Sequence, residues 1–128
     1  MGIEVSGLKE LSAMFERMGK NVEAVQNEAV QAGAEVMKNA IEINTPVGET
    51  GELKKWIVKS KVMKEKDGSP YVEVGPSKFR GFYGRMLEFG TVKMKAQPFV
   101  EPAILEARDE TLSAMNKVIK EAIEDVQR

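Results

Sequence analysis

The spacing of apolar residues changes along the chain, and this change constrains the fold more than any other feature. Between positions 22 and 43, apolar residues recur every three or four positions, the period of an amphipathic helix. They are Val22, Val25, Ala29, Ala32, Val36, Ala40 and Ile43. Pro46 disfavours helical geometry at the preceding residue, so we expect this helix to begin after an Asn21 cap and to end near Asn44. Gly33 lowers helix propensity by about 1 kcal/mol relative to alanine, which favours a close-packing role for it.

Two further helices are expected, one near each end of the chain. The first is short and begins at a Ser6 cap. Its apolar face consists of Leu8, Leu11, Phe15 and Met18. The last helix opens after Pro98, and Pro102 suits its first position because a first-turn N–H has no helical partner. Its predicted core stripe consists of Leu105, Leu112, Met115, Ile119, Ala122 and Val126.

The middle of the chain alternates apolar and charged residues, which is the period of a strand. From Leu53 onward, lysines at 55, 59 and 61 point away from the apolar side chains, so a half-buried strand is predicted. Its apolar face consists of Trp56, Val58 and Val62, with Ile57 and Met63 as exceptions.

A hairpin and two more strands are expected beyond this strand. Asp67-Gly68 lies at the centre of residues 64–70 and is a strong turn signal. The chain returns as a second strand over residues 71–74, which Gly75-Pro76 stops, and residues 91–96 are expected to pair as a third strand.

This order of elements predicts the α+β class. We expect a small antiparallel sheet of three or four strands packed against two long helices, one N-terminal and one C-terminal, plus a short first helix. A chain of 128 residues with 42% apolar content is large enough for one core, so a single domain over residues 1–128 is predicted. So few strands leave exposed sheet edges, which favour assembly with neighbouring copies.

The absence of cysteine and histidine narrows the chemistry. Without them the chain has no disulfides, no thiolate or imidazole metal ligands, and none of the commonest general base at neutral pH. Most hydrolytic mechanisms are therefore out of reach, and the residues suggest no catalytic, metal or cofactor site. No apolar run approaches the roughly 20 residues that span a bilayer, and the first residues lack a secretory pattern, so a cytosolic protein without membrane contact is expected.

The formal net charge of −1 conceals an uneven distribution. Residues 53–95 hold 11 Lys or Arg against 4 Asp or Glu, a net of +7, whereas the rest of the chain holds 8 against 16, a net of −8. One interpretation is that these are solvated surfaces that segregate by segment. The other is docking through patches of opposite charge, either between copies or onto a partner.

The segment from Tyr83 to Ala103 combines an apolar run, one acid and a Gly-Thr stop. Periodicity over residues 83–89 does not separate a helix from a strand, and we favour a helix. Glu88 lies in the apolar run, but no second acid is fixed near it by spacing, which disfavours a general acid. We favour a structural role in which Glu88 accepts backbone N–H bonds or pairs with Arg85, with an intersubunit salt bridge as the alternative.

Basic residues interleave with aromatic residues around this segment, as in proteins that bind single-stranded nucleic acid. The candidate contacts to DNA or to a partner are Lys78, Arg80, Lys93 and Lys95. The near-neutral net charge and the isoelectric point near 5.7 argue against a dedicated nucleic-acid binder.

Three sequence blocks together resemble a known family. They are Thr45-Pro46 with Glu49-Thr50-Gly51-x-Leu53, YGRMLEFGT over residues 83–91, and AQPFVEPA over residues 96–103. In this order they resemble the tail-completion family of long-tailed bacteriophages, named for gene product ten of phage HK-ninety-seven and similar in role to lambda minor tail protein Z. The resemblance runs from about Gly7 to the end of the chain.

The resemblance implies a non-enzymatic protein of a phage or prophage virion that acts in tail completion or head–tail joining. It implies other neck and tail proteins as partners and a homo-oligomeric ring, for which sixfold symmetry is one option, with nucleic acid only as DNA passing through. Assembly would occur in the host cytoplasm. A tail terminator that caps the tail tube and a DNA-contacting accessory phage protein are the alternatives.

The motif positions are expected to serve the fold or an interface. They are Gly51, Leu53, Tyr83, Arg85, Leu87, Glu88, Phe89, Gly90, Thr91, Pro98, Phe99 and Pro102. The resemblance implies that Gly51 and Gly90 make turns. It also implies that Pro98 and Pro102 fix the entry to the last helix. Tyr83, Leu87 and Phe89 are expected to be packing anchors.

Overall fold

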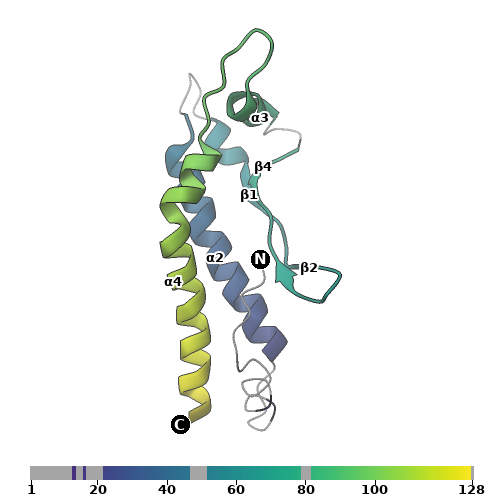
Figure 1. The fold of residues 1–128 in the computed structure, drawn as a ribbon, viewed down its shortest axis with the longest axis vertical. Coiled ribbons are helices and arrows are strands. Elements are labelled where there is room, and N and C mark those ends of the chain that lie inside the picture. Colours follow the sequence, from purple (N-terminus) through teal and green to yellow (C-terminus); the bar gives the residue numbers. More distant parts are fainter. Residues whose placement is uncertain (1–12, 14–15, 17–21, 47–51, 79–81, 128) are drawn as a thin grey trace.

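Two long helices lying side by side in opposite directions form the body of the protein (Figure 1). The computed structural model describes residues 13, 16, 22–46, 52–78 and 82–127. The expected first helix and Gly51 lie outside these ranges. The elements are α2 (Val22–Asn44), the 3₁₀ helix η1 (Glu52–Trp56), β1 (Ile57–Lys59), β2 (Met63–Lys64), β3 (Pro70–Tyr71), β4 (Val74–Pro76), α3 (Phe82–Phe89) and α4 (Val100–Gln127).

Small residues let α2 and α4 approach each other closely. A Cβ atom added to Gly33 of α2 would lie 2.8 Å from Met115 Cγ and 3.2 Å from Thr111 Cγ2 of α4. The predicted close-packing role of Gly33 is therefore confirmed. Both helices also carry buried alanines: Ala29 and Ala34 on α2, and Ala103 and Ala107 on α4.

The core lies at the end of the helix pair that carries α3 (Figure 1). Its buried members are Ile41, Leu53, Ile57, Leu87, Phe99 and Ala103, contributed by α2, η1, β1, α3 and α4 together with the residue before α4. Each element supplies only one or two of these side chains. The position of α3 is therefore fixed by tertiary contacts with elements from across the chain rather than by its own eight residues.

The four strands confirm the α+β class and pair as two antiparallel ladders of two strands each. β1 pairs with β4, so that Ile57 lies opposite Pro76, and β2 pairs with β3. The predicted hairpin at Asp67-Gly68 is confirmed: Gly68 has φ +90°, and Asp67 Oδ1 accepts the Ser69 N–H at 2.9 Å. This hydrogen bond lowers the pKa of the Asp67 carboxyl below its usual value.

Several strand assignments were wrong. Residues 52–56 form η1, and the buried face of β1 is Ile57, whereas Val58 is 44% exposed. Gly75-Pro76 does not stop a strand but completes β4 against β1. Residues 91–96 form a turn rather than a third strand. The strands have only two or three residues, so alternation cannot fix which face is buried.

The helix boundaries were predicted well, but two stripe members were wrong. Ile43 is 77% exposed and Leu105 is 69% exposed, whereas Ile41 and Ala103 are buried. The buried face of each helix is set by the elements that pack against it, and Ile41 and Ala103 belong to the core shared with η1, β1 and α3. α4 begins at Val100, so Pro102 is its third residue rather than its first.

Candidate functional site

Helix α3 is the centre of the candidate site, and the helix expected over residues 83–89 is confirmed as Phe82–Phe89. Its inner face carries Gly84 and Leu87, both buried. A Cβ atom added to Gly84 would lie 3.1 Å from Pro76 Cγ and 3.2 Å from Leu53 Cδ1. The glycine thus lets α3 rest directly on β4 and η1. Leu87 is 4% exposed within the core, which confirms it as a packing anchor.

Gly90 ends α3 in a left-handed conformation. Its φ is +76°, and its N–H donates to the Met86 carbonyl at 2.7 Å. An added Cβ atom would lie 2.9 Å from Ala96 N, so both the backbone angle and the space require glycine. The predicted turn role of Gly90 is confirmed. The Gln97 N–H donates to a second carbonyl at the end of α3, that of Leu87, at 2.6 Å.

A tight turn after Gly90 projects apolar and basic side chains into solvent. The Thr91 N–H donates to the Met94 carbonyl at 2.9 Å, and Thr91 Oγ1 accepts the Met94 N–H at 3.0 Å and the Lys93 N–H at 3.3 Å. Val92, at the tip, is fully exposed. Lys93 and Lys95 are exposed beside it.

Glu88 joins α3 to the start of α4. Its Oε2 accepts the N–H groups of Phe99 at 2.7 Å and Val100 at 2.9 Å, and its Oε1 accepts the Glu101 N–H at 3.0 Å. A helix leaves its first four N–H groups without helical partners. Here Glu88 binds three of them, and the fourth position is Pro102, which has no N–H.

This arrangement places a carboxylate at the N-terminus of a helix, where the helix dipole favours negative charge. The interpretation that Glu88 accepts backbone N–H bonds is confirmed. An ion pair with Arg85 is absent from the described residues. The Glu88 carboxylate is therefore bonded within the chain. Its hydrogen bonds join α3 to the start of α4, and the bonded residues are eleven to thirteen positions apart in sequence.

The outer face of α3 carries large apolar side chains in solvent. Phe82 is 60% exposed and Phe89 is 81% exposed, and they lie seven residues, or two helical turns, apart on the face opposite Gly84 and Leu87. Tyr83 is 55% exposed. The expectation that Tyr83 and Phe89 are packing anchors of the fold was therefore wrong.

Phe82 and Val92 were not predicted as site residues. The seven-residue spacing from Phe82 to Phe89 was the signal that placed both on one face of α3, because residues two helical turns apart lie above one another. Val92 had no comparable signal, since its exposure follows from the turn that Thr91 forms.

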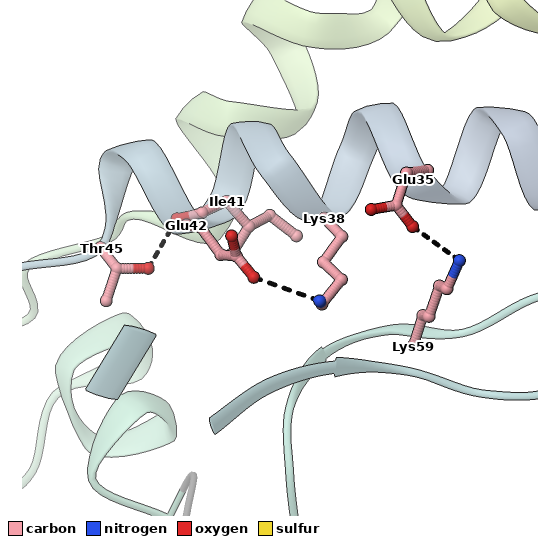
Figure 2. A network of polar contacts seen from close by, with 6 residues as sticks. All are labelled: Glu35, Lys38, Ile41, Glu42, Thr45 and Lys59. Carbon is pink, nitrogen blue, oxygen red and sulfur yellow. Dashed lines mark hydrogen bonds and ion pairs between the residues drawn. The ribbon is translucent and has the colours of Figure 1, made fainter. Parts of the chain in front are cut away.

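The candidate basic contacts differ in their surroundings. Lys78, Lys93 and Lys95 are exposed, whereas Arg80 lies outside the described residues. Lys59, which was not one of the candidates, pairs within the chain: its Nζ lies 2.6 Å from Glu35 Oε2 (Figure 2). This hydrogen bond, together with the lysine charge, lowers the pKa of the Glu35 carboxyl.

Thr45, the first residue of the first motif block, directly follows α2 and caps its end. This residue is buried, and its hydroxyl donates to the Ile41 carbonyl at 2.6 Å (Figure 2). One turn earlier, Lys38 and Glu42, both half-buried, form an ion pair of 3.3 Å (Figure 2). The Thr45 hydroxyl thus satisfies one of the last carbonyls of α2, which ends at Asn44.

The described residues also form two open grooves, one of which, beside β4, is lined by charged and polar side chains that include Lys59, Glu73 and Arg85. No group of three or more Asp and Glu among the described residues is placed to hold a metal ion. A shallow groove of about 350 Å³ between the helices and residues 70–74 is lined mainly by apolar side chains. The side-chain polar groups in this lining are the hydroxyls of Tyr71 and Thr111. No helix in the described part of the chain combines the length and apolar character that crossing a membrane requires.

Comparison with known proteins identifies the family. A family model described as "Bacteriophage HK97-gp10, putative tail-component" matches residues 9–90, well over half of the 128 residues, including α2, the strands and α3. The class so defined is that of bacteriophage tail components. The chain belongs to the HK97-gp10-like family. The match ends at Gly90 and does not extend to the third block, residues 96–103. No curated protein and no solved structure matches the chain.

Proposed function

We propose that the chain is a non-enzymatic structural protein of a bacteriophage or prophage that acts in tail completion or head–tail joining. It works through protein–protein assembly, with other neck and tail proteins and with further copies of itself in a ring. Its place is the virion, and it assembles in the host cytoplasm. Membership of a family of phage tail components supports this assignment.

The observation that carries the proposal is the apolar outer face of α3 inside the family-matched region. Phe82 and Phe89 contribute little to the fold of a monomer, because they are 60% and 81% exposed. Exposed apolar groups that cluster on one surface mark sites of protein interaction. Gly84 and Glu88 meanwhile fix α3 against β4 and α4, so the outer face of α3 is already ordered and accessible to a partner.

Deleting the gene from an inducible phage or prophage tests the role. The expected products are filled heads and tails of normal length that remain separate in electron micrographs, with joining restored by the wild-type gene. A variant with Phe89→Asp should fail to restore joining. Lys66→Asp, an exposed change in the hairpin turn, is the matched control and should restore it.

Other outcomes would support the alternatives. Tails of irregular length after deletion would point to a terminator that caps the tail tube. Joined particles that fail in DNA packaging or ejection would point to a DNA-contacting protein, in which the exposed Lys78, Lys93 and Lys95 make the contacts. Normal infectious particles without the protein would contradict all three roles.

A further inference from the structure

Two exposed patches with opposite charge lie on α3 and on the first turns of α4, two segments at the same end of the molecule (Figure 1). The first, which we call the α3 patch, consists of Phe82, Arg85, Phe89, Val92 and Lys93. All five are exposed, and three of them are large apolar side chains. Arg85 lies between the two phenylalanines on one helical face. From residue 82 to 99 the chain carries three basic residues and one acid, Glu88, which is bound to the start of α4.

The second, which we call the α4 patch, is centred on Leu105 in the second turn of α4. Leu105 is 69% exposed, and Glu101 and Asp109 lie one turn before and after it, both exposed. Arg108 flanks the patch. Along α4 as a whole, seven acidic residues stand against three basic ones, a net of −4. An isolated leucine on a helix surface is ordinary, but this one lies in an acidic setting that complements the α3 patch.

We propose that the α3 patch of one copy docks on the α4 patch of a second copy of this chain. Phe82 and Phe89 would cover Leu105, and Arg85 and Lys93 would meet Glu101 and Asp109. Complementary charge around an apolar centre fixes register and disfavours wrong partners. This inference rests on the proposed function, because it names the surfaces through which copies assemble.

The two patches point in different directions, so the contact joins unlike surfaces. Gly84 and Leu87 hold the inner face of α3 against β4, η1 and the core, and Phe82 and Phe89 lie on the opposite face of α3. Arg85, at the side of this face, borders the groove beside β4. Ala103 and Ala107 are the buried face of α4, and Leu105 projects from the opposite side of that helix. One copy then presents a free patch after each docking event. Contacts between unlike surfaces repeat until they close into a ring or continue as a filament.

A contact between two α3 patches is the main competitor within the same chemistry. Such a contact would bury apolar side chains equally well, but it would bring Arg85 and Lys93 of both copies together. Like charges placed opposite one another in an interface cost several kcal/mol. The α4 patch supplies carboxylates at the corresponding places, and the asymmetric pairing is therefore favoured.

Cysteine cross-linking tests the pairing directly, because the native chain contains no cysteine. Purified Phe89→Cys and Leu105→Cys proteins are each treated with a short bis-maleimide, alone and as an equimolar mixture. We expect a covalent dimer in the mixture and little in either variant alone. Lys66→Cys in the hairpin turn replaces Phe89→Cys in the control mixture and should give no dimer. Phe89 and Leu105 are both exposed, so we expect the two cysteine variants to keep the fold.

Charge reversal supplies the second arm. Adding Arg85→Glu to the Phe89→Cys protein should lower the yield of mixed dimer about tenfold, and adding Glu101→Lys to the Leu105→Cys protein should restore part of it. A dimer of Phe89→Cys with itself would overturn the pairing in favour of an α3–α3 contact. Absence of any cross-link at the highest soluble concentration would also overturn it. Neither result bears on the deletion phenotype, so the proposed function stands or falls separately.

Discussion

Replacing Glu88 should destabilise the protein far more than its partly exposed position suggests. In Glu88→Ala, three N–H groups at the start of α4 lose their acceptor. Loss of a helix cap costs about 1 kcal/mol, and loss of the charge at the helix N-terminus costs up to about 1 kcal/mol more. The N–H of the buried residue Phe99 adds roughly 1 to 3 kcal/mol if it is left unpaired. We therefore expect the free energy of unfolding to fall by about 3 kcal/mol.

A graded variant separates the parts of this effect. Glu88→Gln retains one oxygen that can accept from Phe99 and Val100, but its amide group would face the Glu101 N–H, donor against donor. The expected loss is about half that of alanine, roughly 1.5 kcal/mol, because the charge and one acceptor are removed. Glu110→Gln, an exposed carboxylate in the middle of α4, is the matched control and should change stability by less than about 0.5 kcal/mol.

Urea unfolding with a shared m-value measures these changes, and amide hydrogen exchange localises them. In Glu88→Ala, exchange should accelerate at Phe99, Val100 and Glu101 before it accelerates elsewhere in α4. A stability within about 0.5 kcal/mol of wild type, with unchanged exchange at Phe99, would refute the capping role. A loss of stability with a changed m-value would instead indicate an altered unfolded state.

Three further changes test separate parts of the structure. Gly90→Ala should cost about 1 to 3 kcal/mol in urea unfolding, because alanine is strained at φ +76° and its Cβ would meet Ala96 N at 2.9 Å; a neutral result would contradict the backbone geometry. Phe89→Ala should change stability by less than about 0.5 kcal/mol, whereas a packing anchor would cost about 3 to 5 kcal/mol. The Glu35 carboxyl should titrate below its usual pKa in NMR and return toward it in Lys59→Met. Because the folded-state pKa is lowered, the Glu35 contribution to stability is present above the unfolded pKa and is lost as pH falls through the folded pKa; unchanged titration in Lys59→Met would exclude the ion pair as the cause.

The helices could be predicted from sequence, but their buried faces could not. A pattern sustained over more than twenty residues determines the type and length of α2 and α4. The sequence offers Ile41 and Ile43 as neighbours on nearly opposite faces of α2, and apolar character alone does not choose between them. The choice follows from the core that η1, β1, α3 and α4 build around one face of α2, so Ile41 is buried and Ile43 is 77% exposed.

For the strands and the candidate site, too, the sequence pattern predicts the local structure but not the residues that it meets. With β1 reduced to three residues, the burial of Ile57 rather than Val58 depends on pairing with β4, about twenty residues away. Glu88 could be predicted to accept backbone N–H bonds, but not which ones. Its partners are set by the path of residues 90–98, where Gly90 reverses the chain and Gln97 returns it to α3. Local pattern cannot encode that path.

The contrast between the two faces of α3 explains why this short helix is so firmly fixed. Eight residues are too few to form a stable helix alone, and its only buried side chain of any size is Leu87. Three further contacts hold α3 in place: Gly84 packs closely on β4, Glu88 caps α4, and Gly90 makes the turn that ends α3. None of these contacts uses Phe82 or Phe89. Burying an aromatic side chain of this size contributes roughly 1.5 to 3 kcal/mol, a gain that the isolated chain does not realise at either position. That gain remains for association, and because α3 is already ordered, docking there loses little conformational entropy.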